Sequence, residues 1–329
     1  MAYLLDPAIG VCRFSFCGKG DWQSARDAET DAEIAELRKE RARTLYTRDR
    51  MELRFYLFEN FLLPSLKAQI DRNFLCIILT SDLLPATYLK RLQDLCAGDP
   101  TLEVLVSDAS TVHDALWPRI SALNELAGRP LVNFRIDDDD CLSRDYIQEL
   151  RGFMTRMGDR VPLSYSRSNG LVITHYQADE GINLYRANLP FNSMGTAIRV
   201  HGPRTIFSFG HNALHKRFSA IVDNAGMGYI SIKIDGHDSV PISMEMPHIR
   251  NTHTLIDAEE AENALAKWFS FLGEEGKLYS TLMSHIEAAG KLARGDAKPA
   301  PAKAAAKPPQ TKAKSAQGKK NATKSKKKK

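Results

Sequence analysis

Four consecutive aspartates, Asp137 to Asp140, are the residues whose type and spacing most clearly indicate chemistry in this chain. Like charges a few ångströms apart raise each other's pKa unless a positive charge lies close by. A divalent cation supplies such a charge, and Mg²⁺ and Mn²⁺ prefer carboxylate oxygens, with substrate phosphates and water completing the shell. The run therefore predicts a site for a divalent cation and a diphosphate.

In an extended backbone, neighbouring side chains point to opposite sides. We therefore expect Asp138 and Asp140 to work as a pair, with Asp137 and Asp139 supporting them. Two plainer interpretations stay open: a solvated acidic turn, or N-terminal charge for a helix that begins near Ser143, where carboxylates gain a little from the helix dipole. The run lacks the D-x-[DN]-x-[DN]-G spacing of a calcium-binding loop.

Alternating strands and helices precede the run and indicate an α/β fold with a mixed, mostly parallel sheet flanked by helices. In such sheets ligands bind beyond the carboxyl ends of the strands, where Asp82 and the aspartate run both lie. We expect strands at 9–16, 74–79, 102–106 and 131–136, and helices at 24–45, 51–63, 85–96 and 115–126.

Beyond the run the pattern becomes richer in strands. We expect a helix at 143–157 with Ser143 as its N-cap, and a turn at Asn192 to Gly195 near the acceptor, in which Gly195 allows a sugar to approach; a plain β-turn explains it equally well. The remaining expected elements are strands at 171–175, 196–200 and 229–234, a helix at 212–224, and closing helices within 256–295.

Residues 296–329 have the composition of a disordered tail. Twelve of the 45 Lys and Arg residues lie in 297–329, which has no acid, so the remaining 33 basic groups face 40 acidic ones and give the body a formal charge of −7. The tail could attract a polyanion, or an anionic membrane at about 1 kcal/mol per lysine. It could equally be a solubilising segment without a partner.

The five cysteines form no C-x-x-C pair, which argues against a disulfide framework or a zinc ribbon. The N-terminal residues make a poor signal peptide, and no stretch reaches the ~18 apolar residues of a spanning helix. We expect a cytoplasmic protein, with peripheral binding at the inner face of the membrane left open.

The segments RFYLFENFLLPSLKAQIDRNFLCIILTSDLLP and FRIDDDDCLSRDYIQEL resemble the rhamnosyltransferase family of bacterial glycosyltransferases, which has the GT-A fold, over about residues 9–255. The resemblance implies that a domain at 1–255 moves a sugar, rhamnose by the family's name, from a nucleotide diphosphate donor to a saccharide or lipid-linked acceptor. It also implies a DxD motif in which Asp140 binds Mn²⁺ or Mg²⁺ and Asp138 meets the metal or the donor ribose.

The same resemblance implies further site residues. A late histidine completes the metal shell in this fold, and His253 is the first choice, with His237 second. Nucleotide-sugar contacts are implied for Arg13, Ser15 and Asp82, together with Asp137, Asp138 and Asp139.

An inverting enzyme needs a base opposite the leaving group to take the acceptor's proton. GT-A inverting enzymes place a carboxylate just before a late helix, where this chain reads SFGHNALHKRF and has His211 instead. Three alternatives stay open: His211 is the base, Asp238 is the base, or the reaction is retaining and needs neither.

Three other functions compete with glycosyl transfer. A nucleotidyltransferase would use a similar sheet, but Gly18-Lys19-Gly20 is only a weak form of its Gly-rich, basic signature. A metal-dependent hydrolase would need a second cluster of ligands, and no HxD pattern is present. A polyanion-binding protein could act through the basic tail, which has no aromatic residue for stacking on bases.

Overall fold

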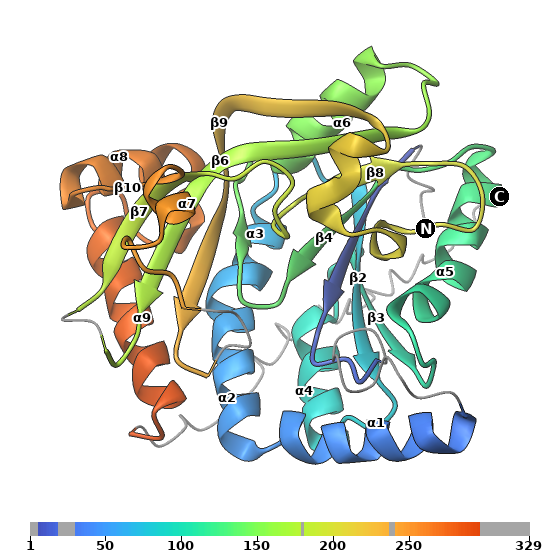
Figure 1. Cartoon of the computed structure of the whole chain (residues 1–329), viewed down its shortest axis with the longest axis horizontal. Helices are drawn as coiled ribbons and strands as arrows, with labels where there is room; N and C mark the ends of the chain where they lie inside the picture. Colours follow the sequence, from blue (N-terminus) through green and yellow to red (C-terminus); the bar gives the residue numbers. More distant parts are fainter. Residues whose placement is uncertain (1–5, 19–29, 179–180, 237–240, 297–329) are drawn as a thin grey trace, which may run out of the picture. The chain divides into compact units, whose positions relative to one another are not determined.

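One mixed sheet of ten strands runs through the part of the chain that this computed structural model describes, residues 6–18, 30–178, 181–236 and 241–296 (Figure 1). Its order is β10-β7-β6-β8-β4-β1-β2-β3, and β9 pairs with both β6 and β5. The strands are β1 Ala8–Arg13, β2 Phe74–Ser81, β3 Leu102–Ser107, β4 Asn133–Asp137, β5 Cys141–Leu142, β6 Leu163–His175, β7 Asn183–Asn188, β8 Ala197–Arg199, β9 Ser219–Ile234 and β10 His253–Leu255.

Strands β3, β2, β1 and β4 are parallel neighbours, as their apolar sequences predict. Arg13 stands opposite Leu79 of β2 and Asp137 of β4, so the carboxyl ends of three strands meet at one edge. Strands β6 and β9 form a second parallel ladder. Antiparallel pairs join the other strands, but the parallel ladders hold most of the paired residues. The predicted fold class is confirmed.

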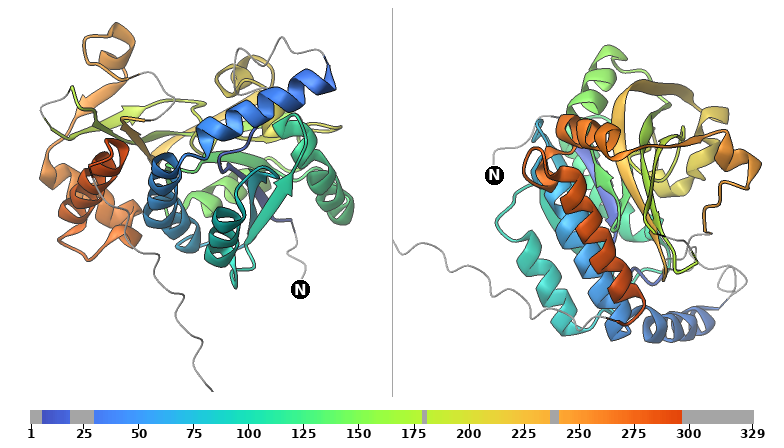
Figure 2. Two further views of the ribbon diagram at one scale, coloured as in Figure 1. Left: turned by 90° about the horizontal axis from the view of Figure 1, so that it is seen from below. Right: turned by 90° about the vertical axis from the view of Figure 1, so that its left-hand side faces the viewer.

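Helices flank the sheet on both sides (Figures 1 and 2). The α-helices are α1 Asp31–Leu45, α2 Arg48–Leu57, α3 Leu63–Lys67, α4 Ala86–Cys96, α5 Val112–Ala127, α6 Tyr146–Arg156, α7 Pro247–Arg250, α8 Ala258–Trp268 and α9 Leu278–Ala293. A π-helical segment, η3 Phe58–Leu62, joins α2 to α3, and the 3₁₀ helices are η4 Ile206–Ser208, η5 His211–Lys216 and η6 Ser270–Leu272.

Alternating side chains of β1 pack into two different hydrophobic cores, because successive residues of a strand point to opposite faces. Cys12 packs in the core that includes Phe55 of α2, whereas Val11 packs in the core with Leu116 and Ile120 of α5. Both faces of the central strands are therefore covered, and only their ends can meet a ligand.

The closing helices belong to the same compact unit as the sheet. Leu53 and Phe61, on α2 and η3, share a core with Leu265 of α8 and Leu282 of α9. Helix α9 lies beside α2 (Figure 2). This packing fixes the position of α2, which carries a residue of the candidate site.

Two expectations about the second half of the chain are wrong. The helix expected at 212–224 is only the short η5, and strand β9 begins at Ser219, because pairing with β6 from Leu163 onward imposes an extended backbone. Helix α6 begins at Tyr146, and Ser143 does not cap it; the Ser143 hydroxyl instead accepts a hydrogen bond from Arg167 at 3.2 Å.

All five cysteines are buried and free. None of the described helices is long and apolar enough to cross a membrane. The expected tail at 297–329, and with it the expectation of disorder there, lies outside the described residues.

Candidate active site

The aspartate run begins where strand β4 ends. The ladder between β1 and β4 stops at the pair Arg13 and Asp137. Residues 138 and 139 then form a turn, and the amide of Asp140 lies 3.4 Å from the carbonyl oxygen of Asp137. The alternation of side chains expected along the run is therefore wrong beyond Asp137, because a turn does not keep the two-residue period of a strand.

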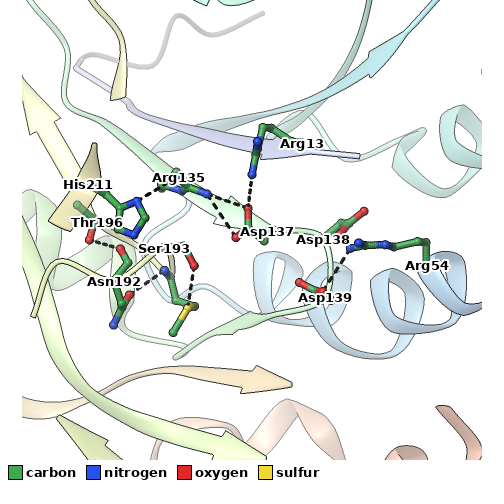
Figure 3. Close-up of polar contacts among 11 residues, drawn as sticks. Arg13, Arg54, Arg135, Asp137, Asp138, Asp139, Asn192, Ser193, Thr196 and His211 are labelled. Atoms are coloured by element: carbon green, nitrogen blue, oxygen red, sulfur yellow. Dashed lines mark hydrogen bonds and ion pairs between the residues drawn. The ribbon is translucent and has the colours of Figure 1, made fainter. Parts of the chain in front are cut away.

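Arg54 of α2 holds this turn (Figure 3). Its Nη1 donates to Oδ1 of Asp138 at 2.5 Å and to Oδ2 of Asp139 at 3.2 Å. Asp138 thus shares its arginine with Asp139 rather than with Asp140. Asp138 is 2% exposed, and its Oδ2 is buried without a hydrogen-bond partner in the described part of the chain. A buried carboxylate oxygen left in this state is an acceptor for a cation.

Asp138 and Asp140 are short of positive charge. Burial raises the pKa of Asp138 to about 7 against the opposing effect of Arg54, and Asp139 adds to the rise. Burial and then Asp139 raise the pKa of Asp140 well above its usual range, and Lys233 opposes them. Oδ1 of Asp140 also accepts a hydrogen bond at 3.3 Å from an amide of β9. This side of the run is one that an added cation would stabilise.

Asp137 has the opposite environment. Its Oδ1 accepts hydrogen bonds from Arg135 at 3.2 Å and from Arg13 at 3.5 Å (Figure 3). Burial alone would raise the pKa of Asp137, but Arg135, Arg13 and Lys233 outweigh it and hold this pKa well below its usual range. Both guanidinium groups lie over the ring of Phe207, at 5.1 and 5.3 Å from its centre. Asp137 therefore orders two arginines at the strand ends.

His211 joins the site through Arg135 (Figure 3). Its Nδ1 lies 3.3 Å from Nη1 of Arg135, and because a guanidinium can only donate, we assign the imidazole proton to Nε2. Burial, followed by Arg135, lowers the pKa of His211 to about 4. The predicted His211 is thus a neutral imidazole beside the run. Asp238, the alternative base, lies outside the described residues.

Three of the six predicted nucleotide-sugar contacts, Arg13, Ser15 and Asp82, lie at the ends of β1 and β2. Arg13 ends β1, and Asp82 directly follows β2. The carboxylate of Asp82 accepts a hydrogen bond at 2.5 Å from Arg38 of α1, and the carbonyl of Ser15 accepts one at 2.9 Å from Tyr46. Helix α1 therefore runs across these strand ends (Figure 1).

The structure does not bring His253 to the aspartates. His253 lies in β10, and strands β7 and β6 separate it from β9, the strand that contacts Asp140. Its Nδ1 contacts the carbonyl of Ile249 at 3.2 Å. The second choice, His237, lies outside the described residues. Within the described ranges, no three His, Cys, Asp or Glu side chains form a group that could hold a metal ion.

The expected turn at Asn192 to Gly195 is present and lies against β4. Oδ1 of Asn192 accepts the amide of Met194 at 2.7 Å, and the amide of Gly195 donates to the carbonyl of Arg135 at 2.8 Å. Gly195 has a φ of 78°, and a Cβ there would lie 2.6 Å from the ring of Tyr146. The close approach that needs this glycine is therefore made by Tyr146, and the approach of a sugar to this turn stays a prediction.

Sequence reasoning missed the basic residues of the site: Arg38, Arg54, Arg135 and Lys233. Two of them carried a signal, because Arg135 interrupts the apolar strand LVNFRI and Lys233 lies among the alternating isoleucines of ISIKI at 230–234. A charged residue in such a strand must face a partner or the solvent. Arg54 and Arg38 lie in helices rich in charge, where nothing distinguishes them from solvated residues.

The sequence of residues 7–246 matches the profile of the family described as "Putative rhamnosyl transferase". The chain belongs to this family. It is therefore a glycosyltransferase. The match covers both the aspartate turn and the segment with His211, and it ends before His253.

A search of curated proteins gave no match. Among solved structures, the chain is similar to TarS of S. aureus at 12% identity, with a TM-score of 0.32, over 68% of this chain and 36% of that one. It is also similar to TarS residues 1–349 in complex with UDP, at 10% identity and a TM-score of 0.33, over 88% of this chain and 91% of that one. The chain thus spans about a third of the longer TarS chain, and its family membership rests on the sequence match.

Proposed function

We propose that this glycosyltransferase moves a sugar from a nucleoside diphosphate donor to a saccharide or lipid-linked acceptor, with Mg²⁺ or Mn²⁺ bound at the aspartate run. Rhamnose is the sugar that the family's description names. The observation that carries the proposal is Oδ2 of Asp138, a buried carboxylate oxygen with no hydrogen-bond partner among the described residues.

Asp138 and Asp140 fit such a cation. Both are buried, and the pKa of each is raised by burial, so one more positive charge would stabilise their ionised forms. Mg²⁺ commonly takes only one or two protein carboxylates and fills its shell with water and phosphate oxygens. We therefore assign the cation to Asp138 and Asp140, without His253. When bound, it neutralises the charge that grows on the leaving diphosphate.

The basic residues around the run support this assignment. Arg54 orients Asp138 and Asp139 from one side of the turn. On the other side, Asp137 orders Arg13 and Arg135, which carry one net positive charge between them after Asp137 is counted. We place the nucleotide across the ends of β1 and β2. There the guanidinium of Arg13 can bind phosphate, the backbone of Ser15 can bind the base, and the carboxylate of Asp82 can bind the ribose.

His211 is the described residue that we assign to acceptor activation. As a neutral imidazole it can accept a proton, whereas an imidazolium could not. Its Nδ1 now receives an N–H of Arg135, so acting as a base requires that Nδ1 exchange this donor for the acceptor's hydroxyl. Arg135 then stays beside the imidazolium that would form, which makes His211 a weak base.

A thermal-shift screen of nucleotide sugars, with and without Mn²⁺, tests the proposal. A ligand that binds only the folded protein raises the melting temperature by mass action. We expect one nucleotide sugar to stabilise the wild-type protein more strongly with Mn²⁺, and Asp140→Asn to lose the metal-dependent part. No shift with any nucleotide sugar would contradict the proposal.

We further propose that residues 297–329 tether the enzyme to an anionic surface at the cytoplasmic face of the membrane, where a lipid-linked acceptor would lie. Their twelve lysines and lack of acids support this. Deleting 297–329 should abolish binding to vesicles that contain phosphatidylglycerol and leave donor binding unchanged. Vesicle binding that survives the deletion would rule the tether out.

A further inference from the structure

Lys233 is a cation next to the aspartate run that the proposed chemistry has not used. Its neighbour in β9, Ile232, donates its amide to Asp140 at 3.3 Å, so the strand touches the run at this point. Within the described residues, no hydrogen bond or ion pair occupies the ammonium group of Lys233. As far as the described residues go, all three of its donors are therefore available to a ligand.

The direction of the strand explains why a lysine is present there. Ile230, Ile232 and Ile234 are buried in the core that contains α8 and α9. Because neighbours in a strand point to opposite faces, Lys233 points away from that core. It is half-buried, and the charges that act on it most strongly are those of Asp140 and then Asp139, which raise its pKa against the effect of burial.

The charges around the turn also show what Lys233 can do. Arg54 already binds Asp138 and Asp139 directly, while no arginine among the described residues binds Asp140. A lysine that served only to neutralise Asp140 would be expected to form an ion pair with it, and no such pair is present among the described residues. A compact ammonium group that faces a cation site without binding its carboxylates is well suited to a phosphate oxygen.

We propose that Lys233 binds the diphosphate of the donor, donating to a phosphate oxygen while Asp138 and Asp140 hold the cation. The inference rests on the proposed function, because it needs a diphosphate at the aspartate run. It adds a residue from β9 to the residues of β1, β4 and α2 that surround the aspartate run. Lys233 is thereby a binding residue for the leaving group.

Calorimetry with inorganic pyrophosphate in excess Mg²⁺ tests this without knowledge of the sugar or the base. Lys233→Gln removes the charge at similar length, and Lys233→Arg keeps the charge. Lys67→Gln, at the exposed end of α3, is the matched control. We expect Lys233→Gln to weaken pyrophosphate binding about tenfold or more, the effect of one charged hydrogen bond. Lys233→Arg should stay within about threefold of the wild type, and Lys67→Gln should match it.

Equal pyrophosphate affinity in Lys233→Gln and the wild type would overturn the inference. A lower melting temperature in Lys233→Gln with unchanged affinity would show a structural role only, and would overturn it as well. Asp140→Asn separates this failure from a failure of the proposed function. If the wild type binds pyrophosphate with Mg²⁺ and Asp140→Asn does not, the result supports the cation site, whichever result Lys233→Gln gives. If the wild type binds neither pyrophosphate nor any nucleoside diphosphate, both fail together.

Discussion

The two ends of the aspartate run differ in how their charge is balanced. Asp137, still part of β4, is bound by Arg13 and Arg135, which hold its pKa below the usual range although burial opposes them. Asp138 and Asp140, past the turn, are nearly fully buried, and burial raises their pKa values although Arg54 and Lys233 oppose the rise. The described residues balance the charge of the carboxylate at the first end of the run, and they leave the carboxylates at the second end short of positive charge.

This contrast shows how neighbouring residues of one type take different roles. An ionised carboxylate with two arginines stabilises the folded chain, since each partner is left worse off without the other. A buried carboxylate with too little positive charge destabilises the folded chain until a cation arrives. We therefore assign structure to Asp137 and ligand binding to Asp138 and Asp140, and variants at the two ends should have opposite effects.

Asp140→Asn should produce the largest effect. Losing a ligand of the cation should lower the rate of sugar transfer about 10² to 10³-fold, the loss typical when one electrostatic contact to the transition state is removed. The same change removes a poorly balanced buried charge and keeps an oxygen for the amide of Ile232, so the melting temperature without metal should rise. Steady-state kinetics and thermal unfolding measure the two effects. A lower melting temperature of Asp140→Asn without metal would contradict the contrast between the two ends of the aspartate run.

His211→Gln should come next, with a fall in the rate of about 10²-fold if His211 takes the acceptor's proton. The pKa of His211 is about 4 in the folded chain and ~6.5 when unfolded. Its neutral form therefore stabilises the fold above pH 6.5, and this contribution is lost as the pH falls from 6.5 towards 4. Unfolding measured across that range should depend less on pH in His211→Gln. An unchanged rate would favour a retaining reaction or Asp238.

Asp137→Asn should lower stability by about 1–3 kcal/mol, because Arg13 and Arg135 lose their shared acceptor and both are partly solvated. The folded pKa of Asp137 is lowered, so its contribution is present above the unfolded value of ~3.9 and disappears as the pH falls through the folded pKa. Denaturant unfolding at pH 7 and below pH 4 measures this. A more stable Asp137→Asn protein would remove the distinction between the two ends.

Arg38→Ala should have the smallest effect. Without Arg38, the carboxylate of Asp82 keeps only the hydrogen bond from the Ser81 hydroxyl among its described contacts, and donor KM should rise about threefold, as expected for loss of one partly exposed hydrogen bond. The rate at saturating donor should not change. Arg43→Ala, an exposed change on the same helix, is the control. Equal KM in the two variants would show that Asp82 does not meet the donor.

Much of the fold followed from the sequence, because strands buried on both faces are continuous apolar runs that can be recognised locally. Strand β2 at Phe74–Ser81 and helix α4 at Ala86–Cys96 lie within two residues of their predicted ranges. Strand β9 was not recognised in its first half, because Ser219 to Asp223 is mostly exposed and becomes a strand only by pairing with β6.

The sequence by itself determined the α/β fold, the family, and the position of an acidic cluster at the end of a strand, because these depend on residues close together in the chain. Only the tertiary structure decided which aspartates of the run have enough positive charge beside them. The cations come from β1, α2, β4 and β9, up to 124 residues away in the case of Arg13 and Asp137. Charges act through space, so the division of the run into a structural end and a binding end exists only once these elements have packed together.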